Sequence, residues 1–227
     1  MGLDPDRKAV PQLYELLRNQ ILSLQLAPGA LLSRAALALE FGTSQTPVRE
    51  ALLRLADEKL VDVFPQASTR VSLIDMTLAR EAHFLRRSLE LEVVRELILQ
   101  GDPLVVVDLQ ALLKKQEILR DAGDFAAFTE ADTAFHRALY VAAGMEPLWR
   151  LLHSRSGHLD RLRRLHLPVA GKLDRIVSDH QKIVAAIVER DIQKAQNALR
   201  DHLSGTLEYV PRIMQEHPDL IRNEQLQ

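Results

Sequence analysis

Residues 42–55 read Gly-Thr-Ser-Gln-Thr-Pro-Val-Arg-Glu-Ala-Leu-Leu-Arg-Leu, which predicts a tight turn followed by a helix. Gly42 can adopt the left-handed conformation that ends a preceding helix. Thr46 is the expected N-cap of the new helix, and Pro47 suits its first position because the missing N–H would have no partner there. One face of this helix is apolar, because Val48, Ala51, Leu52 and Leu55 recur at helical spacing.

The exposed start of this helix carries side chains that can read DNA bases. Gln45, Thr46 and Arg49 lie at the end of a recognition helix that would enter a major groove. Arg49 is the strongest candidate, because a first-turn arginine can donate two hydrogen bonds to guanine O6 and N7. A helix, a four-residue turn and a second helix indicate a helix-turn-helix, although the apolar stripe alone also fits an ordinary corner of a helical core.

The flanking sequence predicts a winged helix-turn-helix with three helices and a small β-hairpin. Ser33 is the expected cap of the short second helix. Arg34 and Arg70 are further candidates for DNA contact, with an exposed surface role as the alternative. The expected elements are helices at 11–24 and 34–41, and strands at 61–64 and 70–74 joined by a loop at 65–69.

The run from Thr43 to Leu55 resembles the recognition-helix signature of the GntR family of bacterial transcription regulators. Residues 26–32, Leu-Ala-Pro-Gly-Ala-Leu-Leu, resemble the family's entry to the preceding helix. The resemblance covers roughly residues 10–75 and implies a DNA-binding domain. Gln45 stands where the family commonly has arginine, which implies a different operator or weaker binding.

Long helical patterns replace the strand patterns after residue 75, which predicts an all-α antiparallel helical bundle and a mainly α protein. Asp124 and Asp191 are expected helix caps, and Pro211 should kink or end the last helix. The predicted helices span 77–100, 103–120, 124–143, 146–166, 168–190 and 191–215. The expected domains are a winged helix-turn-helix at 1–75, the helical domain at 76–215 and a loose polar tail at 216–227.

Three helices of this bundle carry a histidine in the middle of an apolar face. On the helix from residue 124, His136 lies only about 40° from Asp132 around the helix axis, among phenylalanines. His180 and His202 repeat this placement on the last two helices. The five other histidines lack it and are expected at the surface or in linkers: His83, His153, His158, His166 and His217.

Burying an unpaired carboxylate or a charged imidazole is costly, so these inward groups need partners. A single inward histidine is more often a hydrogen-bonded core residue. Three histidines and Asp132 on separate apolar faces favour convergence on one divalent metal ion.

The spacing from Asp132 to His136, with His180 and His202 in their local contexts, resembles the FCD domain of the FadR subfamily of GntR regulators. The resemblance spans about residues 77–212. It implies that these four residues bind a divalent metal, with zinc expected first and nickel or manganese as alternatives. It also implies that a small carboxylate completes the coordination, and that Arg86 is the inward arginine of the effector site.

Composition limits the remaining possibilities. The chain has 227 residues, a formal net charge of −2 and no cysteine, so neither disulfides nor a thiolate metal site are available. Residues 1–75 hold eight Lys and Arg against nine Asp and Glu, so they carry no basic excess. We expect a cytoplasmic protein without a membrane partner, because the first residues do not form a signal peptide and no apolar run approaches membrane length.

These patterns favour a ligand-responsive transcription regulator and not an enzyme. A homodimer is expected to bind a short inverted repeat in double-stranded DNA, and a bound organic acid to alter that affinity. Two alternatives remain open: a metalloenzyme acting on a small acid, because a metal with open positions can activate water, and a repressor that responds to the metal itself.

Overall fold

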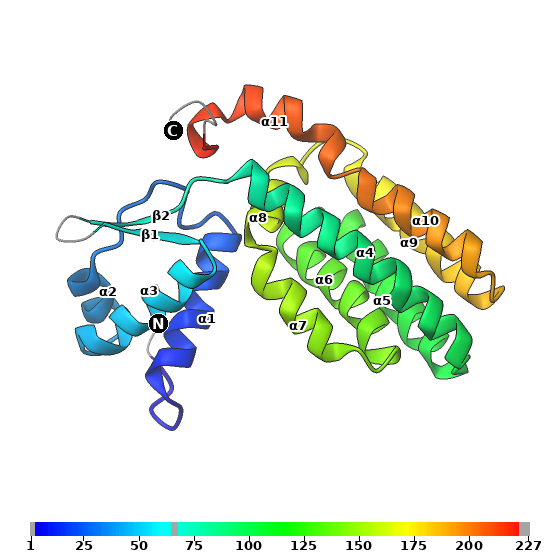
Figure 1. The fold of residues 1–227 in the computed structure, drawn as a ribbon, viewed down its shortest axis with the longest axis horizontal. Coiled ribbons are helices and arrows are strands. Elements are labelled where there is room, and N and C mark those ends of the chain that lie inside the picture. The colour runs from blue at the N-terminus through cyan, green and yellow to red at the C-terminus, as the bar shows by residue number, and fades with distance from the viewer. Residues whose placement is uncertain (1–2, 65–67, 223–227) are drawn as a thin grey trace. The chain divides into compact units, whose positions relative to one another are not determined.

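The structure is a computed structural model that describes residues 3–64 and 68–222. The chain folds into two compact units (Figure 1). The first comprises Met1–Ala79 together with Gly157–Arg164 and Met214–Gln227, and the second comprises Arg80–Ser156 and Leu165–Ile213. No helix in the described ranges is long and apolar enough to cross a membrane.

The first unit is a winged helix-turn-helix, as the sequence predicts. Its elements are α1 (Ala9–Leu22), α2 (Arg34–Glu40), α3 (Gln45–Asp57), β1 (Val61–Val63) and β2 (Thr69–Val71). The two strands form an antiparallel hairpin in which Val61 lies opposite Val71 and Val63 lies opposite Thr69. Residues 65–67 of the predicted wing loop lie outside the described residues.

The core of this unit forms where α1 packs against α3. Leu13 and Leu17 on α1 and Val48 and Leu55 on α3 are fully buried. Burial of each such side chain contributes roughly 1.5–3 kcal/mol relative to exposure. This packing uses one face of α3 and leaves the opposite face exposed.

The turn before α3 differs from the sequence prediction at one position. Gly42 does adopt the left-handed conformation, with φ of +63°, and Ser33 does cap α2, because its side chain accepts a hydrogen bond from the amide of Ala36. The predicted Thr46 cap is wrong. Ser44, with an extended backbone, is the N-cap of α3, so Thr46 already lies inside the helix.

The predicted helix at 146–166 is in fact two helices, α7 (Glu146–Arg155) and α8 (Gly157–His166). The Ser156 hydroxyl donates to the carbonyl of Leu152 at the break. Gly157 then packs so closely on Leu60 that an added Cβ would lie 2.5 Å from its Cδ2. This contact belongs to the first unit, which therefore contains the start of α8.

Polar contacts also hold the start of α8 within the first unit. The Arg161 guanidinium donates to the carbonyl oxygen of Ser72 over 2.6 Å. His158 accepts from the amide of Asp75 through Nδ1 over 2.9 Å and donates to the carbonyl of Lys59 through Nε2 over 3.0 Å. This part of the chain therefore groups with the winged helix-turn-helix by contact, although it is distant in sequence.

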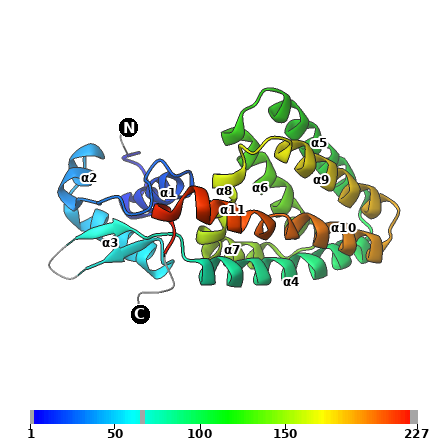
Figure 2. The ribbon, with the colours of Figure 1, turned by 90° about the horizontal axis from the view of Figure 1, so that it is seen from above.

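The described residues of the second unit form helices and the turns that connect them, which confirms the predicted all-α architecture (Figure 2). α9 packs against α10, and α5 packs against α6 and α9. The elements after the hairpin, some of which extend into the first unit, are α4 (Met76–Gln100), α5 (Pro103–Asp121), α6 (Phe125–Ala142), α7, α8, α9 (Lys172–Val188), α10 (Ile192–Ser204), the 3-10 turn Leu207–Tyr209, α11 (Val210–Glu216) and the 3-10 turn Pro218–Leu220.

The helix ends in this part of the chain confirm some predictions and correct others. Asp124 and Asp191 cap α6 and α10 by accepting backbone amide hydrogen bonds, as predicted. The helix expected from residue 168 instead begins after a turn, at Lys172. The last helix breaks before Pro211, which lies in the first turn of α11.

The described part of the C-terminal tail is attached to the first unit and is not loose. Ile221 is 3% exposed and forms a parallel β-bridge with Ile74. The amide of Ile74 donates to the carbonyl of Leu220, and the amide of Arg222 donates to the carbonyl of Ile74. Residues 223–227 of the predicted tail lie outside the described residues.

Candidate metal centre and nucleic-acid interface

Four side chains from three helices of the second unit meet in its interior. Asp132 and His136 come from α6, His180 from α9 and His202 from α10. One ligand atom from each lies within 4.8 Å of all the others. Asp132, His136 and His180 are at most 2% exposed. The structure thus brings together the four residues that the sequence singled out.

Each of the three imidazole rings approaches the others with its Nε2 atom. The Nε2 of His202 lies 3.2 Å from the Nε2 of His180 and 3.2 Å from the Nε2 of His136. Asp132 completes the group, with Oδ1 3.7 Å from the Nε2 of His180.

The outer nitrogen of each ring faces a polar side chain. The Nδ1 of His136 donates to Glu90 over 2.9 Å, and the Nδ1 of His180 donates to the Gln116 carbonyl oxygen over 2.8 Å. A neutral ring that donates through Nδ1 carries a lone pair on Nε2. Two bare nitrogens therefore point at the centre of the cluster.

The third ring has an acidic neighbour in the corresponding position. Asp179 lies 3.8 Å from the Nδ1 of His202. Glu90, Gln116 and Asp179 were not singled out from the sequence. The sequence does contain one indication for Gln116. It follows Leu109 and Leu113 at helical spacing on α5, so a polar residue stands on the apolar face of that helix.

The electrostatic environment keeps the buried rings neutral. Burial, together with the charge of Arg86, lowers the pKa of His136 to about 4. Burial and the neighbouring histidines lower the pKa of His180 well below its ordinary value. Although burial raises the pKa of Glu90, the charge of Arg86 and the hydrogen bonds donated by His136 and Arg86 outweigh it and hold that pKa at about 2. Glu90 is therefore a buried carboxylate anion.

Neutral imidazoles and a carboxylate around one point are the donor set of a divalent metal site. Two imidazole nitrogens bound to one metal at about 2.1 Å lie about 3.0–3.4 Å apart, depending on the coordination angle. The Nε2 separations of 3.2 Å fall in this range. The cluster could therefore hold a metal ion with little rearrangement.

Arg86 lies on α4 beside this cluster. It is 6% exposed, and its Nε donates to Glu90 over 2.7 Å. The second oxygen of Glu90 accepts from His136, so one carboxylate links the arginine to a ring of the cluster. Arg86 thus places a positive charge in the interior of the second unit.

Three of the histidines expected at the surface or in linkers are buried. His83 contacts the carbonyl of Leu203 over 3.1 Å, and His166 stacks on the ring of Tyr209. His158 is held within the first unit. Each uses its ring in a hydrogen bond or an aromatic contact within the core, which helical facing alone does not predict.

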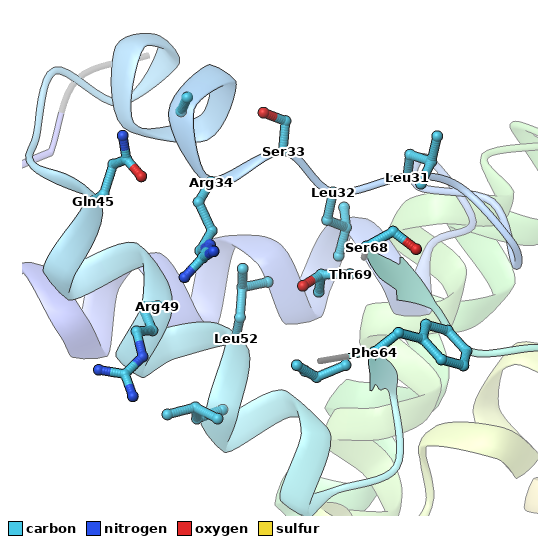
Figure 3. Close-up of a pocket in the computed structure, with 13 residues that line it drawn as sticks. Leu31, Leu32, Ser33, Arg34, Gln45, Arg49, Leu52, Phe64, Ser68 and Thr69 are labelled. Atoms are coloured by element: carbon cyan, nitrogen blue, oxygen red, sulfur yellow. The ribbon is translucent and has the colours of Figure 1, made fainter. Parts of the chain in front are cut away.

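A hollow of about 680 Å³ opens on the surface of the first unit (Figure 3). Arg34, Gln45 and Arg49 line it together on one side, and Phe64 and Thr69 of the hairpin region lie on the other. The full lining is Leu31, Leu32, Ser33, Arg34, Ala35, Gln45, Arg49, Leu52, Leu53, Val63, Phe64, Ser68 and Thr69.

The predicted DNA-contact residues are all exposed: Arg34, Gln45, Thr46, Arg49 and Arg70. Within the described residues, no ion pair joins Arg34 or Arg49 to an acidic side chain. Arg70 lies on β2 and does not line the hollow. Cationic side chains without internal partners remain available to phosphate or base oxygens.

An exposed recognition helix with a small wing, followed by a helical unit with a buried polar centre, defines a DNA-binding regulator with a sensor domain. The comparisons with known proteins agree. Residues 10–71 match the family described as bacterial regulatory proteins, gntR family, and residues 81–205 match the FCD domain. The chain belongs to the GntR family of transcription regulators, and its FCD domain is the ligand-sensing part.

Relatives of known name support the same conclusion. A regulator in an unstable DNA locus of Streptomyces ambofaciens is 38% identical over 93% of this chain and 89% of its own length. The transcriptional repressor RspR of Escherichia coli is 28% identical over 98% of this chain and 97% of its own length. Because these relatives are transcription regulators, the enzyme alternative is not supported, and the chain is not an enzyme.

A solved structure shares the fold. The E. coli protein McbR/YncC aligns with a TM-score of 0.78 and 23% identity, covering 93% of this chain and 99% of that one.

Proposed function

We propose that this GntR regulator binds one divalent metal ion through Asp132, His136, His180 and His202. The observation that carries the proposal is the convergence of the Nε2 atoms at 3.2 Å, a separation suited to nitrogens that share a metal. Zinc is the first candidate, and nickel or manganese also accept such nitrogen and oxygen ligands. Glu90 and Gln116 would orient the rings for this role.

The effector in this proposal is a small carboxylate that completes the metal coordination. Four protein ligands leave further positions open on a five- or six-coordinate metal. Arg86 supports the assignment, because it is a buried cation whose planar fork suits a carboxylate. Its hydrogen bond to Glu90 would hold the guanidinium in place for the ligand.

The DNA target is a short inverted repeat bound by a homodimer, since a two-fold protein selects a two-fold site. Arg34, Gln45, Thr46, Arg49 and Arg70 are the proposed contacts. Their exposure supports this role, and so does the grouping of three of them around one hollow. Effector and operator would then influence each other's affinity by the same factor, as linkage requires.

The metal assignment is tested by elemental analysis of protein purified without chelators or metal-affinity resin. We expect close to one metal ion per chain in the wild type and a large loss in the double variant His180→Ala/His202→Ala. His153→Ala serves as the control, because His153 lies outside the cluster. This variant should keep the full metal content of the wild type.

Operator binding is measured on the same preparations, so that the DNA assignment is judged separately from the metal assignment. Unchanged metal content and unchanged thermal stability in the double variant would refute the proposed centre. Wild-type protein that binds no inverted repeat in a genomic selection would refute the proposed DNA target, whatever the metal result.

A further inference from the structure

Tyr140 is a buried polar residue that the proposed function does not use. It lies on α6 one helical turn after His136 and two turns after Asp132, on neighbouring positions of the same helix surface. Its side chain is 0% exposed. Its hydroxyl has no hydrogen-bond partner among the described residues.

A hydroxyl in this position requires an explanation. Leaving a buried hydroxyl without a partner destabilises the folded protein, and most buried polar atoms in native proteins have a hydrogen-bond partner. Phenylalanine would supply the same ring, which here packs against Trp149 at a centroid distance of 5.5 Å. The ring therefore accounts for the packing, while the hydroxyl remains to be explained.

The surroundings of Tyr140 connect it with the candidate metal centre. Burial raises the pKa of its hydroxyl, the charge of Glu90 raises it further, and the charge of Arg86 lowers it. In the structure, Tyr140 lies one helical turn from His136, whose ring donates a hydrogen bond to Glu90. The two oxygens of Glu90 already accept hydrogen bonds from Arg86 and His136. The Tyr140 hydroxyl is therefore a further polar group beside these residues, and it is not engaged by Glu90.

We infer that the Tyr140 hydroxyl belongs to the effector site and hydrogen-bonds an oxygen of the effector other than its metal-bound carboxylate. The effector class is therefore a small acid that carries a hydroxyl group elsewhere on its skeleton. This inference rests on the proposed metal and carboxylate site. A site built to hydrogen-bond a ligand oxygen discriminates strongly against the analogue that lacks it, because its own polar group is then left unpaired.

The test uses four acids with one carbon skeleton: butyrate and its 2-, 3- and 4-hydroxy derivatives. Their affinities are measured by calorimetry on full-length, metal-loaded wild type and on Tyr140→Phe. We expect at least one hydroxy isomer to bind wild type tenfold or more tightly than butyrate does. Tyr140→Phe should bind that isomer and butyrate with similar affinity, while its metal content stays unchanged.

Tyr209→Phe is the matched control. Tyr209 also belongs to the second unit, and its ring stacks on His166. We expect this variant to retain the preference for the hydroxy acid. A melting temperature of Tyr140→Phe that equals or exceeds the wild-type value without acid would show that the variant folds and that the hydroxyl does not stabilise the acid-free protein.

Two results would overturn the inference. One is a metal-loaded wild type that binds no hydroxy isomer better than butyrate, and the other is a Tyr140→Phe variant that keeps the wild-type preference. Both leave the metal centre intact and so refute the role of Tyr140 alone. Wild type without bound metal would instead refute the proposed centre, and this inference with it.

Discussion

At the scale of single residues, the side chain behind each histidine ring decides which nitrogen faces the centre. Gln116 accepts from the Nδ1 of His180 and so leaves its Nε2 free of a proton. Gln116→Leu removes this acceptor, and we expect metal affinity to fall about 10- to 100-fold. Competition with a chelator of known affinity measures the change.

The control for this variant is Gln181→Leu, on α9 next to His180. Gln181 is exposed and donates to Glu117, away from the cluster. It should keep the wild-type metal affinity. Equal affinities of both variants and wild type would show that the ring orientation of His180 does not depend on Gln116.

Arg49 tests the proposed nucleic-acid interface. It is exposed on α3 and can donate two hydrogen bonds to guanine. We expect Arg49→Ala to lose about 1–3 kcal/mol of discrimination at one base position of each half-site. Binding to a library of operator variants measures this loss, with wild type and mutant compared at one salt concentration.

Arg54→Ala is the matched control on the same helix. The Arg54 guanidinium lies over the ring of Tyr14, 5.9 Å from its centroid. This variant should leave the base preference unchanged. An unaltered preference in Arg49→Ala as well would contradict base readout by Arg49.

The sequence predicts that four side chains face inward and converge, but not which residues support them. Helical periodicity places Asp132, His136, His180 and His202 on apolar faces, and the structure brings them within 4.8 Å. Glu90 was not foreseen, because its partner His136 lies 46 positions away on another helix. Helical periodicity gives the direction of side chains around one helix at a time, whereas such contacts depend on how the helices pack together.

At the scale of whole elements, helix type was easier to predict than helix ends. Long periodic patterns correctly predicted that the second unit is built of helices, although several of the predicted helix ends are wrong. The break between α7 and α8 was missed, because Ser156 and Gly157 do not interrupt the helical pattern in sequence. The new helix begins at Gly157, the residue that packs against Leu60 in the tertiary structure.

Gly157→Ala tests this contact. A methyl group would lie 2.5 Å from Cδ2 of the fully buried Leu60. The overpacking costs about 1–3 kcal/mol, while the higher helix propensity of alanine returns at most about 1 kcal/mol. We expect a net loss of stability, visible as a lower melting temperature of the first unit.

Gly205→Ala is the control for this substitution. Its added methyl would lie 3.4 Å from its nearest neighbour, Nη2 of Arg175, and its φ is −61°. It should unfold at nearly the wild-type temperature. A Gly157→Ala variant that is as stable as this control would mean that Leu60 moves aside at little cost.

At the scale of the whole molecule, the division of the chain was the feature least visible in sequence. Residues 157–164 group with the winged helix-turn-helix because buried polar side chains hold them there. Arg161 is 0% exposed, and its hydrogen bonds reach Ser72 across 89 positions of the chain. From the sequence alone, an arginine in a helix is expected to be exposed to solvent, because its distant partners are not visible there.

The same contacts make stability depend on pH through His158. Burial, together with the charge of Arg161, lowers the pKa of His158 to about 3. The unfolded chain, with a histidine pKa near about 6.5, binds the proton first. The stabilising contribution of the neutral ring is therefore complete above about pH 6.5, and it falls as the pH decreases toward 3.

His158→Gln isolates this contribution. The variant should be less stable than wild type at pH 7, because the contacts to Asp75 and Lys59 are disturbed. Its deficit should shrink by about 1–2 kcal/mol between pH 7 and pH 5, since only wild type loses the term from His158 in this range. Denaturant unfolding at both pH values measures the difference. His217→Gln, which alters a partly exposed histidine, is measured beside it as the matched substitution. A deficit of His158→Gln that stays constant between the two pH values would mean that His158 takes up its proton in the folded protein as readily as in the unfolded chain.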